Sequence, residues 1–181
     1  MATLFTHAFT AGALVACAPA GLPRRRLLLA AAALSVLPDL DVAGFPLGVA
    51  YGHPFGHRGF THSLLFAALV APLATRWVLP GARLASRPWR RVTLVLFLAT
   101  ASHGVLDAFT DGGLGVGFLL PFDETRYFAP LRPLRVSPIG VDAFLQGRVL
   151  PILRSEILWV WAPAVASVAA WKLARRRPGP I

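Results

Sequence analysis

The sequence predicts an all-α membrane protein, a bundle of about four to five transmembrane helices. Of its 181 residues, 56% are hydrophobic and only 14% are charged, whereas soluble domains usually carry about 25% charged residues. The mean hydropathy is +0.62. The apolar residues gather in separate segments with arginine runs beside them. We therefore expect one integral-membrane domain over residues 1–174, followed by a basic cytoplasmic tail at 175–181.

Five apolar segments account for the predicted helices, and four of them stand out clearly. Spanning a bilayer takes about 20 residues, so the 12-residue second segment is expected to stop partway across or to lean on its neighbours. Pro72 and Pro163 fall inside segments, where neighbouring helices can satisfy the carbonyls that they free. The segments are residues 2–18, 27–38, 60–80, 92–109 and 157–174.

The arginines predict the orientation. They cluster at 24–26, between 76 and 91, and at 175–177, and such clusters beside apolar segments mark cytoplasmic flanks. Five crossings then place the N-terminus outside, the C-terminus inside, and residues 40–58 and 110–156 outside. The net charge of +10 could indicate nucleic-acid binding, but because the basic residues flank apolar segments we expect no nucleic-acid partner.

Four of these segments carry a polar residue at one depth. His7 lies 12 residues before Pro19, Asp39 lies 13 after Arg26, His62 lies 14 before Arg76, and His103 lies 12 after Arg91. At 1.5 Å per residue, each is roughly 18–21 Å from the cytoplasmic end of its helix. Ionisable residues inside a membrane are expensive and mark functional sites, so a shared layer predicts one site.

The residue types in this layer predict a metal site. Imidazole and carboxylate groups without a thiolate set suit Zn²⁺, Mn²⁺ or Fe²⁺, held as two ions or as one ion with carboxylates orienting the histidines. A single histidine such as His7 can instead hydrogen-bond a neighbouring helix, and His53 is expected to decorate a loop. The candidate ligands come from "PDLD", "HRGFTHS" and "SHGVLD" and are His7, Asp39, Asp41, His57, His62, His103 and Asp107.

Arginines near these ligands predict recognition of an anion. Arg58 stays charged and can hold phosphate or carboxylate with two parallel hydrogen bonds. The outer connection contains "RYFAPLRPLRVSPIG" at 126–140. Its Arg126, Arg132 and Arg135 either cover the mouth of the site and bind substrate, or face solvent and lipid headgroups.

Together, His7, "LPDLD", "HRGFTHS", "SHGVLDAFTDGG" and "RYFAPLRPLRVSPIG" resemble the YdjM-like family of bacterial inner-membrane metal-dependent hydrolases. The resemblance covers most of the chain. It implies a helical hydrolase of the bacterial inner membrane with His and Asp metal ligands, and it leaves the substrate open.

The predicted activity is hydrolysis of a phosphoester or related ester of a lipid-like or amphiphilic substrate. A bound metal lowers the pKa of its water and polarises the ester, and a carboxylate, either Asp39 or Asp111, would take the proton. Thr61 and Ser63 are expected to donate hydrogen bonds to the ligands. The main alternative is a non-enzymatic membrane regulator or adaptor with a structural metal; a transporter, which would use the polar layer as an ion site, is less well supported because repeat symmetry is lacking.

Overall fold

The computed structural model of the chain describes residues 1–146 and 149–176, and within these residues it is helical, with isolated β-bridges in place of strands. This confirms the all-α class. Residues 177–181 of the predicted tail lie outside the described part. The helices are α1 (Leu4–Cys17), α2 (Arg24–Val36), the 3₁₀ helices η1 (Leu37–Leu47) and η2 (Phe60–His62), α3 (Leu64–Val78), α4 (Arg87–Ala108), α5 (Val141–Gln146), α6 (Val149–Glu156), the π-helical turn η3 (Ile157–Trp161) and α7 (Ala162–Arg176).

The apolar helices match the five predicted segments. Within the described residues, three stretches are long and apolar enough to cross a membrane: Arg24–Leu47, Arg87–Ala108 and Val149–Arg175. The helices Leu4–Cys17 and Leu64–Val78 are apolar but shorter. At 1.5 Å per residue these two extend roughly 21–23 Å, less than the approximately 30 Å hydrocarbon core. They therefore begin or end below one membrane surface.

Two helices are longer than the sequence pattern predicts. The second segment does not stop at residue 38, because it continues past Val36 as the 3₁₀ helix η1, which ends at Leu47. The next residue, Gly48, caps this helix with a φ of 82°, in the left-handed region that favours glycine. The last segment begins at 149 rather than 157. Its early proline, Pro151, falls in the first turn of α6, where its missing N–H costs no helical hydrogen bond.

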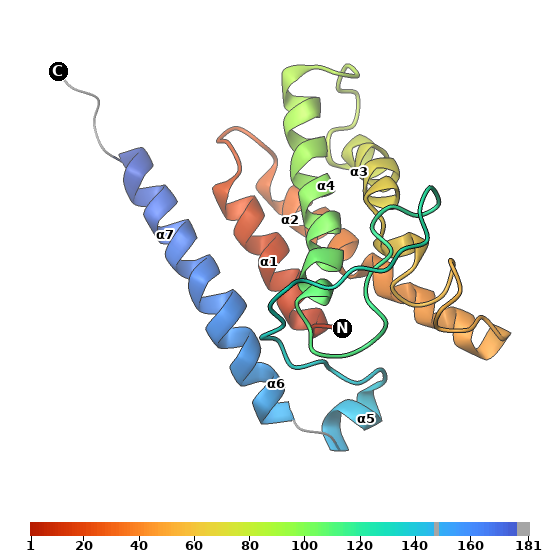
Figure 1. The fold of residues 1–181 in the computed structure, drawn as a ribbon. Coiled ribbons are helices and arrows are strands. Elements are labelled where there is room, and N and C mark those ends of the chain that lie inside the picture. The colour runs from red at the N-terminus through yellow and green to blue at the C-terminus, as the bar shows by residue number, and fades with distance from the viewer. Residues whose placement is uncertain (147–148, 177–181) are drawn as a thin grey trace.

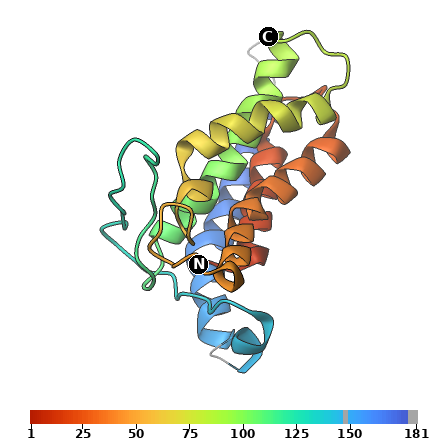
Figure 2. The same ribbon diagram turned by 90° about the vertical axis from the view of Figure 1, so that its right-hand side faces the viewer.

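Helices α1 to α4 pack together around an apolar core, and α7 lies at the edge of the bundle against α1 (Figures 1 and 2). The core holds many small side chains, among them Ala11, Ala31, Ala71 and Ala99, which are fully buried. Small residues let helix backbones approach closely, as is typical of membrane bundles. In the apolar part of the long helix that contains α7, every described residue is exposed or only half-buried.

A π turn joins α6 to α7 where they meet α1. The Ala162 N–H bonds to the carbonyl of Ile157 five residues back, and the next residue, Pro163, has no N–H to offer. The wide turn faces α1. There the ring of Trp161 stacks on that of Phe9 with the centroids 5.0 Å apart, and the Trp161 indole N–H donates to Thr6 Oγ1 at 2.7 Å. The last helix is thus attached to the bundle mainly through α1.

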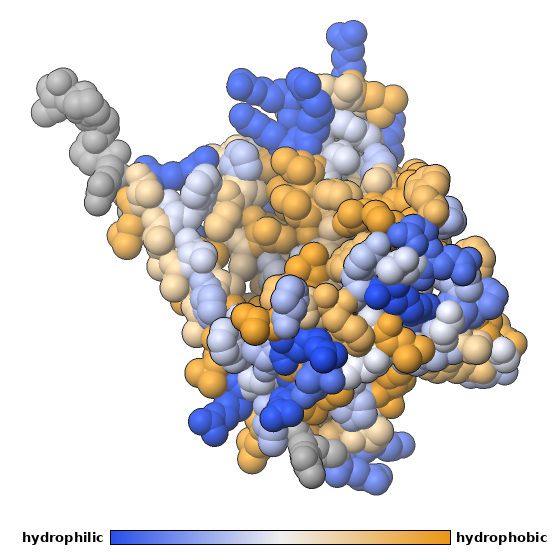
Figure 3. Space-filling view, in the orientation of Figure 1, coloured by the Kyte–Doolittle hydropathy of each residue, from blue (hydrophilic) through white to orange (hydrophobic). Residues whose placement is uncertain are grey.

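The molecular surface changes polarity along the bundle. Hydrophilic residues gather over the start of α4 at the top of Figure 3, and an apolar belt lies below them. The lower end mixes polar and apolar groups, and there the connection after α4 folds back over the bundle. Its contacts include Gly117 N–H to Arg58 O at 2.9 Å and Leu64 N–H to Phe118 O at 3.0 Å. This connection therefore packs against the "HRGFTHS" segment.

We expect residues 40–58 and 110–156 to face away from the cytoplasm, because the arginine clusters lie at the opposite end. In a Cys17→Ala background, the exposed positions Phe55→Cys and Leu131→Cys should react with a membrane-impermeant thiol reagent in intact cells. Leu84→Cys, exposed in the connection between α3 and α4, is the control and should react only after lysis. The opposite labelling pattern would reverse the orientation.

Candidate metal centre

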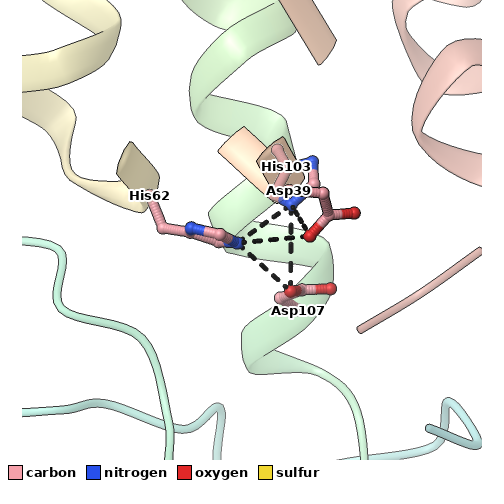
Figure 4. A group of neighbouring side chains, drawn as sticks. All are labelled: Asp39, His62, His103 and Asp107. Atoms are coloured by element: carbon pink, nitrogen blue, oxygen red, sulfur yellow. Dashed lines mark hydrogen bonds and ion pairs between the residues drawn. The ribbon is translucent and has the colours of Figure 1, made fainter. Parts of the chain in front are cut away.

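Four side chains from separate parts of the chain meet in one buried group, Asp39, His62, His103 and Asp107 (Figure 4). Asp39 comes from η1, His62 from η2, and the other two lie one turn apart on α4. All four are buried. We call this set the four-residue group. It lies near the end of α4 that is remote from the arginine-rich end (Figure 1).

The four ligand atoms have the spacing of a tetrahedral metal site. His62 Nε2 is 3.1 Å from His103 Nε2. Asp39 Oδ1 is 3.3 Å from His103 Nε2 and 3.7 Å from His62 Nε2, and Asp107 Oδ2 is 3.9 and 3.7 Å from the same nitrogens. Ligands about 2.0–2.2 Å from a zinc ion would be roughly 3.3–3.6 Å apart. The protein thus brings the donors together close to the separation that an ion requires.

Hydrogen bonds turn both imidazoles so that their Nε2 atoms face the centre of the group. His103 Nδ1 donates to the carbonyl of Ser35 at 2.7 Å. Because the Thr61 hydroxyl gives its hydrogen to Asp41 Oδ2, it accepts from His62 Nδ1 at 3.1 Å, and Asp41 Oδ2 lies 3.2 Å from the same nitrogen. Each Nε2 therefore presents a lone pair to the centre, which is the usual way in which outer partners orient histidine ligands.

Two glycines allow close backbone contacts that place His62: Gly104 lets the segment approach α4, and Gly59 lets the loop before His62 fold back on itself. A Cβ on Gly104, next to His103, would lie 2.9 Å from the His62 carbonyl oxygen. A Cβ on Gly59 would lie 2.2 Å from the carbonyl oxygen of Pro54. Neither position tolerates a larger residue without moving backbone, so both glycines are part of the site's construction.

A second group of potential ligands, Asp41, His57 and His62, overlaps the first through His62. Asp41 is its hub: Oδ1 lies 2.8 Å from His57 Nδ1, while Oδ2 accepts from the Thr61 hydroxyl at 2.8 Å and the Arg58 amide at 3.2 Å. Thr61 thus donates to the site as predicted. Ser63 does not, because its hydroxyl accepts from the Phe66 amide and caps α3.

His7 lies beside the four-residue group rather than in it. Its ring is fully buried and stacks on His103, with centroids 3.8 Å apart. Its Nε2 is 3.6 Å from Asp107 Oδ1, an oxygen that also accepts from the Ala2 amide at 2.7 Å. The structure therefore brings His7, Asp39, His62 and His103 to one layer, as their depths along the helices predict.

Arg58 is fully buried next to Asp107, with a backbone φ of 63°, a conformation that costs free energy for a non-glycine residue. Its Nε is 3.2 Å from Asp107 Oδ2, and its other two nitrogens donate to the Gly112 carbonyl and the Thr110 hydroxyl at 2.8 and 2.9 Å. Two of its five N–H groups thus have protein acceptors, whereas Nε is only within ion-pair distance of Asp107 and has no hydrogen-bond partner.

Several buried polar atoms of this cluster have no hydrogen-bond partner within the described protein. They include both oxygens of Asp39, Asp107 Oδ2 and both ring nitrogens of His7. Leaving such atoms buried and uncompensated is costly. One proton shared by the two Nε2 atoms would satisfy those nitrogens but not the carboxylates. A divalent cation would satisfy all four ligand atoms of the group, so the residues present fit a metal ion.

The remaining predicted site residues lie outside the cluster. Asp111 is exposed and accepts from Arg135 and the Val136 amide, each at 2.8 Å. Partial burial acts to raise its pKa, but these two hydrogen bonds outweigh it, so the pKa lies below the usual value. Arg126 donates to the carbonyls of His57 and His53, each at 3.1 Å. Arg132 lies over the ring of Phe128.

One buried carboxylate was not predicted from the sequence. Glu156, at the end of α6, accepts from the Thr3 amide and hydroxyl at 2.6 Å each and from the Thr6 hydroxyl at 2.7 Å. These contacts tie the last helix to the start of α1. The neighbouring Ala2 amide bonds Asp107, so the tie also supports the four-residue group. An acid directly before an apolar run, as in "SEILWVW", is the signal that marks it.

Comparison with known proteins agrees with this architecture. Residues 1–177 match the family described as "YdjM inner membrane protein". The chain belongs to the YdjM family. It is 41% identical over 174 residues to the "Inner membrane protein YbcI" of Escherichia coli (strain K12), covering 91% of this chain and 94% of that protein. No solved structure matches the chain. Membership of the YdjM family confirms the resemblance seen in the motifs and the location in the inner membrane.

Replacing Glu156 with alanine should destabilise the fold, because the Thr3 amide and two threonine hydroxyls would lose a charged acceptor in a buried place. Hydrogen bonds to charged groups contribute about 1.5–3 kcal/mol each, so a fall in melting temperature of several degrees is expected in detergent. Arg154→Ala, an exposed change two residues away on α6, is the control. Equal melting temperatures for the two variants would contradict the structural role of Glu156.

Proposed function

We propose that the chain is a membrane-embedded metal-dependent hydrolase that acts on a phosphoester or related ester of an amphiphilic substrate. The four-residue group carries this proposal. Two imidazole nitrogens and two carboxylate oxygens from distant parts of the chain converge at 3.1–3.9 Å. This donor set suits Zn²⁺ or Mn²⁺, and the buried carboxylate oxygens without hydrogen-bond partners support a cation there.

We favour one ion, held by the four-residue group, over two. A second ion in the overlapping group would need both ring nitrogens of His62 as ligands, and therefore an imidazole without either proton. Asp41 Oδ2, 3.2 Å from His62 Nδ1, instead fits the orienting carboxylate that commonly accompanies a metal-bound histidine. In this account Asp41 is a positioning residue.

When bound, the metal would supply Lewis acidity and lower the pKa of a coordinated water. Among the chain's own groups, His57 is one candidate for the proton acceptor because it lies beside the four-residue group. Its Nδ1 lies 2.8 Å from Asp41 Oδ1 and 4.0 Å from Asp39 Oδ1. Asp39 is the second candidate, whereas Asp111 is held by Arg135 at the surface.

Arg58 would provide positive charge for an anionic ester. Its guanidinium lies 3.2 Å from Asp107 Oδ2, and so beside the four-residue group. Three of its five N–H donors make no hydrogen bond to the described protein, and a planar guanidinium can present two donors to one phosphoryl group. The substrate would be a lipid-like molecule, because the group lies within a helical bundle of the inner membrane.

One observation favours a non-enzymatic role. Four protein ligands fill a tetrahedral coordination sphere, and structural sites are closed in this way whereas catalytic sites keep an open position. A metal held only for structure would suit a membrane regulator or adaptor. Turnover of an ester by the metal-loaded protein separates the two roles, because the structural site predicts none.

The four-residue group should hold about one equivalent of a transition metal in protein purified from membranes. His62→Ala and His103→Ala remove a ligand each and should each lose most of the metal, as measured by elemental analysis. His53→Ala, which removes an exposed loop histidine, is the control and should retain it.

Gly104→Ala provides a sharper test, because it keeps every ligand but pushes the His62 backbone away from α4. We expect loss of metal in this variant as well. Full metal content in both the His62→Ala and the His103→Ala variants would show that the ion binds elsewhere.

Arg58→Lys should keep the metal but lower the rate of hydrolysis of a phosphoester amphiphile by about 100-fold or more, the size typical of a lost electrostatic contact in the transition state. Lysine is a point charge and cannot form the same pair of hydrogen bonds. Arg132→Lys is the matched control and should leave the rate unchanged. Unchanged turnover in Arg58→Lys would exclude the anion-binding role.

A further inference from the structure

A cationic groove lies at the arginine-rich end of the bundle, far from the metal centre. It runs between the end of α1 and the last turns of α7. Its lining includes the small residues Ala16, Ala18 and Ala20. Its rim carries Arg24, Lys172 and Arg175, and Trp171 forms one wall. We call these seven residues the cationic groove.

The positive charge of the groove is not balanced by its own elements. All eight acidic residues of the chain lie between positions 39 and 156, so α1, α2 up to Val36 and α7 contain none. Arginines at the end of α3, in the following connection and in the first turns of α4 add further positive charge at this end of the bundle (Figures 1 and 3). An anion from outside the chain would therefore be attracted to this place.

Local contacts hold the rim in position. Arg24 donates to the carbonyls of Val15 and Ala18, the latter at 2.8 Å, and so caps the end of α1. The Arg175 guanidinium lies over the Trp171 ring, 4.5 Å from its centroid. Lys172, which follows Trp171 in the sequence, is exposed. Tryptophan together with lysine and arginine is typical of the boundary between hydrocarbon and headgroups.

We infer that the cationic groove binds the headgroup of an anionic phospholipid. In an inner membrane protein, the anions that lie at this boundary are lipid phosphates, and basic pockets between transmembrane helices recognise them. The phosphate would lie among Arg24, Lys172 and Arg175. Acyl chains would run along the uncovered apolar face of α7, where Val165 and Leu173 are exposed. The lipid would fill space between α7 and α1 that the alanines leave open.

Native mass spectrometry of the full chain, released from detergent with phosphatidylglycerol or phosphatidylethanolamine of the same acyl chains, tests this inference. We expect retained phosphatidylglycerol and little phosphatidylethanolamine. The double variant Lys172→Gln/Arg175→Gln should weaken phosphatidylglycerol binding about thirtyfold, the product expected for two cations at a lipid surface. Arg24 is left unchanged because it also caps α1.

Two further variants distinguish a specific site from general charge. Arg83→Gln/Arg87→Gln removes the same charge from exposed positions at the same end and should change binding less than threefold. Ala20→Phe keeps every charge but fills the groove and should reduce binding as much as the Lys172/Arg175 pair does. Three results would each overturn the inference. They are equal retention of the two lipids, an equal loss of binding in the Lys172/Arg175 and Arg83/Arg87 double variants, and full binding by Ala20→Phe.

Discussion

The need to compensate charged groups inside a membrane bundle governs this structure. Asp39 and Asp107 are buried among apolar helices, and an uncompensated carboxylate in such a place is expensive. The protein surrounds them with His62, His103 and Arg58, yet both oxygens of Asp39 still lack hydrogen-bond donors. A divalent cation is the simplest group that completes this arrangement. The strained backbone at Arg58 and the close glycine contacts are understandable as the cost of assembling it.

Short helices explain how the site can lie below the membrane surface. Both α1 and α3 are too short to cross the hydrocarbon core, so they leave room at one end of the bundle. The "HRGFTHS" segment and the connection after α4 fill that room, and backbone hydrogen bonds such as that from Gly117 to Arg58 hold them together. Irregular backbone at this depth is tolerated because it is buried in protein. In this arrangement His57 and Arg58 reach the site from a turn, and His62 reaches it from the short 3₁₀ helix η2.

The layer of His7, Asp39, His62 and His103 could be predicted from the sequence because counting residues along the apolar segments, from Pro19 or from the arginine clusters, gives an approximate depth. The all-α fold class could be predicted because the apolar segments are long enough to form helices that lie in a membrane. Contacts that depend on tertiary packing could not be predicted. Asp111 follows the "HGVLD" motif closely but lies past the end of α4, where Arg135 reaches it. Arg126 binds backbone carbonyls, and Glu156 pairs with Thr3 across 153 positions of sequence; no local pattern encodes either partner.

X-ray absorption spectroscopy at the metal edge, on protein purified into lipid nanodiscs, tests the central claim most directly. Ligation by the four-residue group predicts nitrogen and oxygen donors only, at about 2.0–2.2 Å, with the scattering pattern of two imidazoles per ion. It also predicts the loss of one imidazole's contribution in whatever metal His103→Ala retains. A sulfur ligand, a spectrum without imidazole, or protein that holds no transition metal after gentle purification would contradict the account.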